Sequence, residues 1–202
     1  MLSELPLRDA ELLIDPDWLA PARASGLMSS LREDLDWEVH RIRMFGRWVD
    51  SPRLSSWIGD EGAGYVYSGA RFEPRPWHPA MAELRSELRS VLGIDFNSAL
   101  ANWYRDGRDA MGWHSDDEPE LGRRPVIASI SLGASRRFAL KHRRDARQKL
   151  TLELPHGSLL LMRGDTQTNY RHALPRTTRP VADRINLTFR QIRADSRETP
   201  LL

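Results

Sequence analysis

The sequence predicts a mainly β protein, a jelly roll with helices flanking one of its sheets. Beyond Gly93, short segments either alternate apolar and polar residues with a period of two or form short apolar runs. Gly, Pro, Asp and Asn residues separate these segments, which is typical of an all-β sandwich and not of alternating strands and helices. Before Gly93, apolar residues recur at helical spacings instead. We therefore expect helices first and a β core after them.

The helices are expected in the first half of the chain. Residues 17–32 are compatible with one or two short helices, interrupted at Pro21 and Gly26. Over residues 78–92, four apolar residues recur three and four apart and make one apolar face, and Gly93 stands where this helix should stop. The four residues are Met81, Leu84, Leu88 and Val91.

Six strands are expected after the second helix. They cover residues 98–104, 126–132, 137–142, 150–154, 158–162 and 184–192. Residues 37–45 and 65–67 would add strands at the entrance side of the jelly roll. No internal repeat is visible, so we expect one domain over residues 1–202. Within it, a helical portion would end near residue 95 and the β core would occupy residues 96–193.

Composition limits the classes of function. The 202 residues include no cysteine, which excludes disulfide scaffolds, thiolate metal sites and thiol catalysis, so any metal must bind to His, Asp or Glu. No apolar run is long enough to cross a bilayer and no secretory signal is apparent, so we expect a cytoplasmic protein. Only Lys141 and Lys149 are lysines among 30 basic residues. The arginines suit nucleic acid or an acidic small molecule, although a genome rich in G and C would produce the same bias.

His114, Asp116 and His172 form a candidate metal site. On a strand or extended loop, His114 and Asp116 project to the same side and can bind one ion together. Two imidazoles and one carboxylate leave three positions of an octahedral Fe(II) open for a cosubstrate and oxygen. A zinc hydrolase uses similar ligands, and a packed histidine is the commoner case, so spacing alone leaves these alternatives open. The other four histidines are interpreted as structural or surface residues: His40, His78, His142 and His156.

A polar face on the last predicted strand indicates an anion site. Four polar side chains alternate there with three apolar ones, so the two sets face opposite sides. The polar four are Arg184, Asn186, Thr188 and Arg190. If they point inward, the buried guanidinium groups need an anionic partner, for which a dicarboxylate is suitable. Asn102 and Tyr104, again on one strand face, would complete its cradle. If the polar face is solvated instead, the segment is simply an edge strand.

Taken together, these motifs resemble the AlkB family of Fe(II)- and 2-oxoglutarate-dependent dioxygenases. The resemblance covers residues 40–193, and the motifs occur in family order. They are Asn102-x-Tyr104, Asp106-Gly107, His114-x-Asp116 followed by Asp117-Glu118, residues 127–133, residues 156–160, His172-x-Leu174-Pro175 and Arg184-x-Asn186-x-Thr188-x-Arg190. Residues 44–48, 52–53 and 65–69 look closest to the branch of human AlkB homologues 2 and 3, the DNA repair demethylases. The family implies a double-stranded β-helix whose N-terminal portion, to about residue 95, recognises the nucleotide.

The resemblance also implies a reaction and its cofactors. Fe(II), 2-oxoglutarate and O2 would hydroxylate alkyl groups on DNA bases such as N1-methyladenine and N3-methylcytosine, with release of formaldehyde, succinate and CO2. The implied Fe(II) ligands are His114, Asp116 and His172. Implied 2-oxoglutarate contacts are Asn102, Tyr104, Arg184, Asn186 and Arg190. Arg184 would hold the distal carboxylate, and Arg190 would lie near the carboxylate that chelates iron.

Substrate contacts follow from the same resemblance. Tyr65 and Tyr67 share a strand face and could border the flipped base, although aromatic pairs on strands usually pack a core. Asp117 and Glu118 would favour cationic damaged bases, unless they form only a solvated acidic turn. Phe45 corresponds in position to a side chain that wedges into duplex DNA, with a hydrophobic patch under a loop as the alternative.

The basic segment 141–149 joins two predicted strands. Its arginines Arg143, Arg144 and Arg147 would contact DNA phosphates, as would Arg53, whereas an isolated charge run is more often a solvated loop. We expect a monomeric bacterial enzyme that repairs alkylated DNA. Two alternatives remain at this point: a related dioxygenase that acts on RNA or protein, and a non-catalytic nucleic-acid-binding module.

Overall fold

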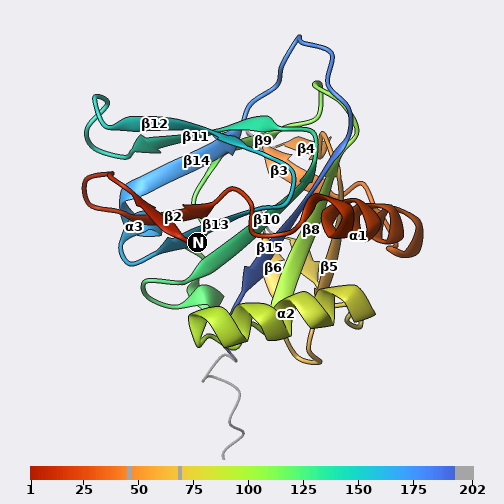
Figure 1. Ribbon diagram of the computed structural model, residues 1–202. Coiled ribbons are helices and arrows are strands. Elements are labelled where there is room, and N and C mark those ends of the chain that lie inside the picture. The colour runs from red at the N-terminus through yellow and green to blue at the C-terminus, as the bar shows by residue number, and fades with distance from the viewer. Residues whose placement is uncertain (45–46, 68–69, 194–202) are drawn as a thin grey trace, which may run out of the picture.

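Two antiparallel sheets face each other in the computed structural model, which describes residues 1–44, 47–67 and 70–193, with the backbone alone over 42–44, 65–67 and 70–72 (Figure 1). The large sheet has the order β1 (Ser3–Leu5), β2 (Glu11–Asp15), β13 (Ser158–Arg163), β10 (Ile127–Gly133), β15 (Arg184–Arg190), β8 (Ser98–Tyr104) and β5 (Leu54–Gly59). The small sheet has the order β12 (Lys149–Leu154), β11 (Arg136–His142), β14 (Tyr170–Leu174) and β9 (Met111–His114). The predicted jelly roll is confirmed.

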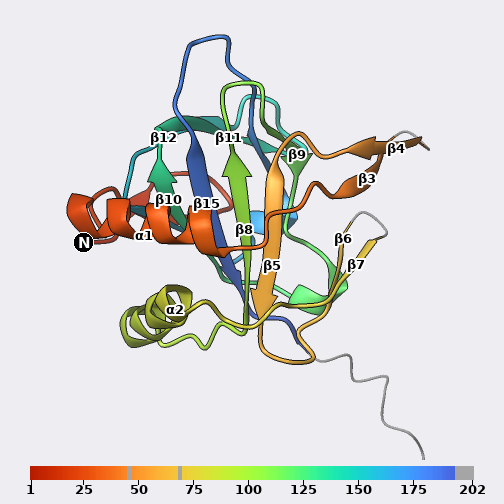
Figure 2. The same ribbon diagram turned by 90° about the vertical axis from the view of Figure 1, so that its right-hand side faces the viewer.

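Two hairpins lie outside these sheets. One pairs β3 (Arg41–Met44) with β4 (Arg47–Asp50), and the other pairs β6 (Tyr65–Tyr67) with β7 (Ala70–Phe72). Figure 2 shows both hairpins projecting from the same side of the molecule, beyond β5 and β9. The strands expected at the entrance side are therefore present, although the first begins at Arg41 and not at residue 37.

The helices α1 (Pro21–Asp34) and α2 (Pro79–Leu92) cover the outer face of the large sheet (Figure 2). The expected range 17–32 holds one helix and not two, and this helix begins only at Pro21, which occupies the first turn, where its missing N–H costs nothing. The second helix ends as predicted at Gly93, whose φ of 68° suits glycine. Short helical turns also occur at α3 (Thr166–Asn169) and at Pro119–Leu121.

One part of the predicted apolar face of α2 is wrong. Met81, Leu84 and Leu88 are buried, but Val91 is 60% exposed. Leu92, one residue further on, packs against the core instead. A helix turns 100° per residue, so the position that continues the buried stripe after Leu88 is the fourth residue along and not the third.

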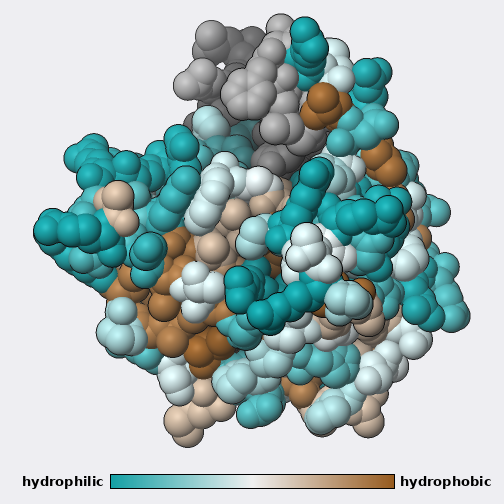
Figure 3. Space-filling view, turned by 90° about the horizontal axis from the view of Figure 1, so that it is seen from above, coloured by the Kyte–Doolittle hydropathy of each residue, from teal (hydrophilic) through white to brown (hydrophobic). Residues whose placement is uncertain are grey.

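Alternating side chains divide the interior into two layers. On β10, Ala128, Ile130 and Leu132 pack toward the helices, whereas Ser129 faces the opposite way and lines a cavity between the sheets. The same alternation holds on β15. At the surface, hydrophobic residues seen from above gather mainly in one area surrounded by hydrophilic ones (Figure 3). None of the helices in the described part of the chain is long and apolar enough to span a membrane.

All six strands predicted after the second helix are present, with ends shifted by at most two residues. The sequence did not single out β1, β2, β5, β9 and β14. Of these, β1, β2 and β5 come from the first 95 residues and extend the large sheet at its two edges. Strands β9 and β14 matter most for function, because they pair with His172 opposite His114.

Candidate active site

The predicted metal ligands come together at one edge of the small sheet. His114 is the last residue of β9, Asp116 lies two residues after it, and His172 lies on β14. Their ligand atoms lie within 4.8 Å of one another, and His172 Nε2 is 3.8 Å from Asp116 Oδ2. One ion with bonds of about 2 Å can bridge such a set after small side-chain movements. Two imidazoles and a carboxylate suit Fe(II) and leave half of its coordination sphere open.

Neighbouring groups orient these ligands. His114 Nδ1 donates a hydrogen bond to the Gly112 carbonyl oxygen at 2.9 Å, which leaves Nε2 with its lone pair for a metal. Arg190 Nη2 donates to Asp116 Oδ1 at 2.8 Å, so the other oxygen, Oδ2, faces His172. Gln167 on α3 accepts a hydrogen bond from the Asp116 backbone N–H at 3.0 Å. Asp116 is thus held in position through both its side chain and its backbone.

The electrostatics of the site favour the ligand forms of all three groups. Burial lowers the pKa of His172 to about 3 and also lowers the pKa of His114, so both imidazoles are neutral at neutral pH. Burial by itself would raise the pKa of Asp116. The positive charge of Arg190 and the hydrogen bond from it outweigh this effect and hold that pKa well below its usual value. A neutral imidazole and an ionised carboxylate are the states that bind metal ions.

The polar face of β15 points inward, in agreement with the predicted anion site. Its register with β8 places Arg184 opposite Tyr104 and Asn186 opposite Asn102. These four side chains line the same cavity as the metal ligands, together with Thr188 and Arg190. The solvated edge strand is excluded, because β15 lies between β10 and β8.

Arg184 is a buried cation that still has a donor to offer. It is 1% exposed, and burial lowers its pKa to about 10. Nη1 donates to the Leu154 carbonyl oxygen at 3.1 Å, and Nη2 donates to Ser131 Oγ at 2.7 Å. Its Nε is buried and has no hydrogen-bond partner among the described residues. A carboxylate in the cavity would satisfy this donor and the positive charge, so the residues fit 2-oxoglutarate.

Arg53 corrects the sequence-based expectation. We expected it to contact a DNA phosphate, but it is 4% exposed, so that expectation is wrong. Nε donates to Asn102 Oδ1 at 2.8 Å, and Nη1 donates to the Ala110 carbonyl oxygen at 3.4 Å. Because Asn102 Oδ1 is occupied in this way, its amide Nδ2 is the group left to donate into the cavity. Arg53 therefore positions a cavity residue.

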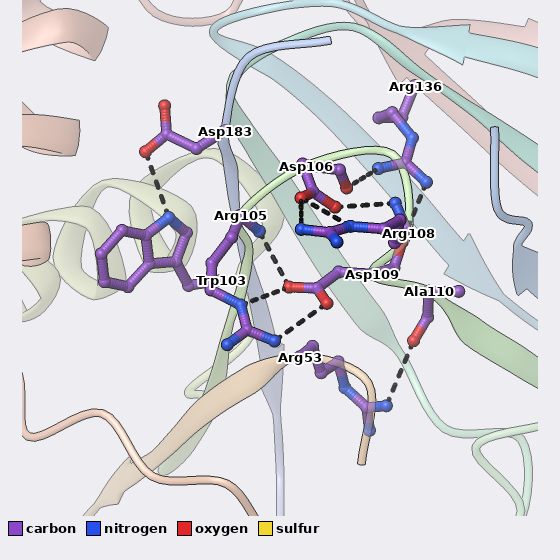
Figure 4. Close-up of polar contacts among 9 residues, drawn as sticks. All are labelled: Arg53, Trp103, Arg105, Asp106, Arg108, Asp109, Ala110, Arg136 and Asp183. Atoms are coloured by element: carbon purple, nitrogen blue, oxygen red, sulfur yellow. Dashed lines mark hydrogen bonds and ion pairs between the residues drawn. The ribbon is translucent and has the colours of Figure 1, made fainter. Parts of the chain in front are cut away.

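The loop between β8 and β9, residues 105–110, is held by a network of polar contacts (Figure 4). Arg136 is buried under this loop and donates to the carbonyl oxygens of Asp106 and Asp109, each at 3.0 Å. Asp109 in turn accepts from Arg105 Nε at 2.8 Å. These contacts fix the strand that carries Tyr104 relative to the strand that carries the first metal ligand.

Sequence reasoning missed several residues of the site. Ser129 accepts from Asn186 Nδ2 at 2.8 Å, and Ser131 accepts from Arg184. Their signal was present, because two small polar residues alternate with apolar ones in the stretch 127–133, but no role was drawn from it. Gln167 gave no signal, since a single helical turn brings it beneath the metal site.

The expected substrate contacts are only partly described. Asp117 is exposed and forms an ion pair with Arg143, whose Nη2 also donates to Ser115 Oγ at 2.8 Å. Arg144 is exposed, and Arg147 pairs with Asp145. Glu118 is half-buried. The predictions for Phe45 and for the side chains of Tyr65 and Tyr67 fall outside the described residues.

Three of the four remaining histidines accept backbone hydrogen bonds, which confirms their interpretation as structural residues. His78 accepts the Ala80 N–H at the start of α2, and His156 Nδ1 accepts the Gly133 N–H at 2.8 Å. His142 Nδ1 accepts the N–H groups of two residues in the following turn. His40 is half-buried, and burial lowers its pKa.

Comparisons with known proteins agree with this geometry. Residues 11–190 match the model of the 2OG-Fe(II) oxygenase superfamily. The chain is 38% identical over 192 residues to the DNA oxidative demethylase ALKBH2 of Bos taurus, covering 90% of this chain and 69% of that protein. It is 34% identical over 208 residues to the human alpha-ketoglutarate-dependent dioxygenase alkB homolog 3, covering 98% and 72%.

A solved structure, that of OsALKBH1, shares the fold, with a TM-score of 0.64 and 15% identity over 95% of this chain and 100% of that one. At this identity the likeness shows the fold alone. The matches in sequence show more, because they extend over most of the chain and include the metal and anion sites. The chain belongs to the 2OG-Fe(II) oxygenase superfamily and, within it, to the AlkB family of Fe(II)- and 2-oxoglutarate-dependent dioxygenases.

Proposed function

We propose that this enzyme repairs alkylated DNA by oxidising the alkyl group on a base nitrogen, with N1-methyladenine and N3-methylcytosine as its substrates. The observation that supports this most directly is the 38% identity, over most of the chain, to proteins named DNA oxidative demethylase. The products are the restored base, formaldehyde, succinate and CO2. Loss of the alkyl group needs no covalent nucleophile from the protein.

The metal ligands in this proposal are His114, Asp116 and His172. When bound there, Fe(II) with 2-oxoglutarate and O2 supplies the oxidant for the alkyl group. Arg184 binds the distal carboxylate of 2-oxoglutarate through its Nε, while its Nη groups stay bound to the protein. The Asn102 amide and the Tyr104 hydroxyl complete that carboxylate's surroundings. These contacts orient the cosubstrate before the DNA arrives, so that only the base has to be positioned.

Arg190 and Asn186 have different tasks within the same proposal. Arg190 keeps the Asp116 carboxylate ionised and turned toward the metal position, and its charge would attract the other carboxylate of 2-oxoglutarate. Asn186 holds the floor of the cavity, since its Nδ2 donates to Ser129 Oγ and its Oδ1 accepts from Thr188. Asn186 therefore shapes the pocket more than it contacts the cosubstrate.

Recognition of the damaged base depends on charge. N1-methyladenine and N3-methylcytosine are cationic, and Asp117 follows the metal ligand Asp116 directly. A carboxylate beside the cavity favours a cationic base over a neutral one. We assign the same role to Glu118, and we assign base stacking to Tyr65 and Tyr67. Phe45 would fill the space in the duplex that the flipped base leaves.

Mass spectrometry of oligonucleotides tests the proposal. The substrate is a single- or double-stranded oligonucleotide with one N1-methyladenine or N3-methylcytosine, incubated with protein, Fe(II), ascorbate and 2-oxoglutarate. We expect the loss of one CH2 unit in mass, dependent on 2-oxoglutarate. Matched RNA serves as the competing substrate. Succinate release without any change in DNA would contradict the proposal and indicate another substrate.

We also infer that the enzyme is a monomer in a bacterial cytoplasm, with DNA as its partner. Sedimentation of the purified protein at several concentrations tests the monomer. A sedimentation coefficient that rises with concentration toward that of a dimer would overturn it.

A further inference from the structure

The outer face of the small sheet carries a row of exposed cations. Cross-strand pairing places Lys141 on β11 next to Lys149 on β12 on one side and next to Arg171 on β14 on the other. All three side chains are exposed. Their neighbours Leu140 and His172 point into the molecule, so these three point out. We call Lys149, Lys141 and Arg171 the outer cation row.

An exposed tryptophan stands beside this row. Trp113 on β9 keeps 45% of its surface exposed. The Lys141 ammonium lies over this ring, 4.1 Å from its centre, so the ring face already holds a cation that a stacking base would have to displace. Large aromatic rings are usually buried, and one left open in a cationic surface is the pairing that single-stranded nucleic acid requires.

The charges of the row are not neutralised by the protein. The nearby carboxylates have other partners: Asp117 pairs with Arg143, Asp145 with Arg147 and Glu153 with Arg137. Among the described residues, no carboxylate forms an ion pair with a member of the outer cation row. The surface therefore attracts an anion of extended shape, such as a phosphodiester backbone.

The metal site borders this surface. β9 is the edge strand of the small sheet, and along it Trp113 directly precedes the metal ligand His114. Successive residues of a strand face opposite sides, so the inner cavity and the outer face meet at this edge. A strand of DNA whose damaged base enters the cavity would therefore reach the outer face by passing around β9.

We propose that the DNA strand next to the damaged nucleotide runs over the outer face of the small sheet. One base stacks on Trp113, and the following phosphates contact the outer cation row. The base takes the place of the Lys141 ammonium on the ring, and Lys141 turns to a phosphate. This inference rests on the proposed function, because it needs a DNA substrate in the cavity.

The test is binding of a fluorescent single-stranded 15-mer with a central N3-methylcytosine, measured by anisotropy without O2 on protein loaded with Fe(II) and 2-oxoglutarate. For Lys141→Ala combined with Arg171→Ala, we expect the dependence of log affinity on log salt to flatten by about 1.4, because each phosphate contact to a single strand contributes about 0.7. Trp113→Leu should weaken binding about tenfold with an unchanged salt dependence, and Trp113→Phe should restore most of the loss.

Arg137→Ala is the matched control. Arg137 lies on the same strand and face as Lys141, but Glu153 already neutralises it, so its loss should leave affinity and salt dependence unchanged. Iron content and thermal unfolding of each variant show that the site beside Trp113 is intact. Equal affinity and equal salt dependence in wild type, the double variant and Trp113→Leu would overturn the inference.

The outcomes also separate this inference from the proposed function. If the wild type dealkylates the 15-mer and the variants bind it like the wild type, the proposed function stands and the proposed DNA contact on the outer face is refuted. If the variants bind the 15-mer more weakly but the wild type does not dealkylate it, the nucleic-acid surface is supported and the proposed reaction is contradicted.

Discussion

The inner and outer faces of the small sheet use charge in opposite ways. Inside, the charged groups are held in place by hydrogen bonds: Asp116 accepts from Arg190, and Arg184 donates to Ser131 and a backbone carbonyl while its Nε stays unpartnered among the described residues. Outside, Lys141 and its neighbours are exposed and bound to no described carboxylate. Low dielectric makes the inner contacts strong and an unpaired charge costly, whereas water screens the outer ones. The inside is built for one small anion and one ion, and the outside for a long flexible polyanion.

The largest expected effect comes from the inner face. His172→Ala removes a neutral imidazole from the metal site, and we expect turnover of 2-oxoglutarate to fall below detection. DNA affinity should stay within about threefold of wild type, because the outer face is untouched. Succinate release in quenched reactions measures the turnover of 2-oxoglutarate, and fluorescence anisotropy measures the DNA affinity. Comparable turnover in the variant would refute the ligand assignment.

Arg184→Gln should affect the cosubstrate next most strongly. A hydrogen bond to a charged group contributes about 1.5–3 kcal/mol, so we expect KM for 2-oxoglutarate to rise about 10- to 150-fold. Ser135→Ala, on a loop outside the cavity, is the control and should leave KM unchanged. An unchanged KM in Arg184→Gln would mean that another residue holds the distal carboxylate.

The buried imidazoles predict a pH dependence of stability. The unfolded chain takes up a proton on His172 near pH 6.5, but the folded protein does so only near pH 3. The unfolded state therefore binds more protons between these values, so stability of the metal-free protein falls as pH drops from about 6.5 toward 3. The slope per histidine is at most about 1.4 kcal/mol per pH unit. Urea unfolding after chelation measures it, and a flat profile would contradict the burial of neutral His172.

Arg53→Gln should affect the inner cavity and not the outer face of the small sheet. Since Arg53 holds Asn102 and the carbonyl oxygen of Ala110, its loss leaves buried groups without partners. We expect a loss of about 1–3 kcal/mol in stability and a higher KM for 2-oxoglutarate. The salt dependence of DNA binding should stay unchanged. A flatter salt dependence would instead restore Arg53 as a phosphate contact.

Arg144→Ala should give the smallest effect. Arg144 is exposed on the β11–β12 turn, so one phosphate contact at most is lost. We expect about a twofold to threefold loss of DNA affinity at physiological salt, and a flattening of the salt dependence by less than one unit. Arg147→Ala is the comparison, because Asp145 already pairs with Arg147. Titrations at two salt concentrations distinguish them.

The site was predictable wherever it depends on alternation along a single strand. The inward polar face of β15 and the pairing of Asn102 with Tyr104 on β8 follow from the period of two. Arg53 was not predictable in this way. An arginine before a strand looks like a surface residue in sequence, and only the approach of β5 to β8 buries it against Asn102.

The sequence by itself determined the mainly β class, most strand positions, the second helix and the residue types of the metal and anion sites, because these depend on local periodicity and on chemistry that few residues can provide. The tertiary structure decided which charges are paired. It placed Gln167 against Asp116, paired Arg143 with Asp117 and set Lys141 on the ring of Trp113. Such partners are far apart in sequence, and only the packing of the two sheets sets their distances.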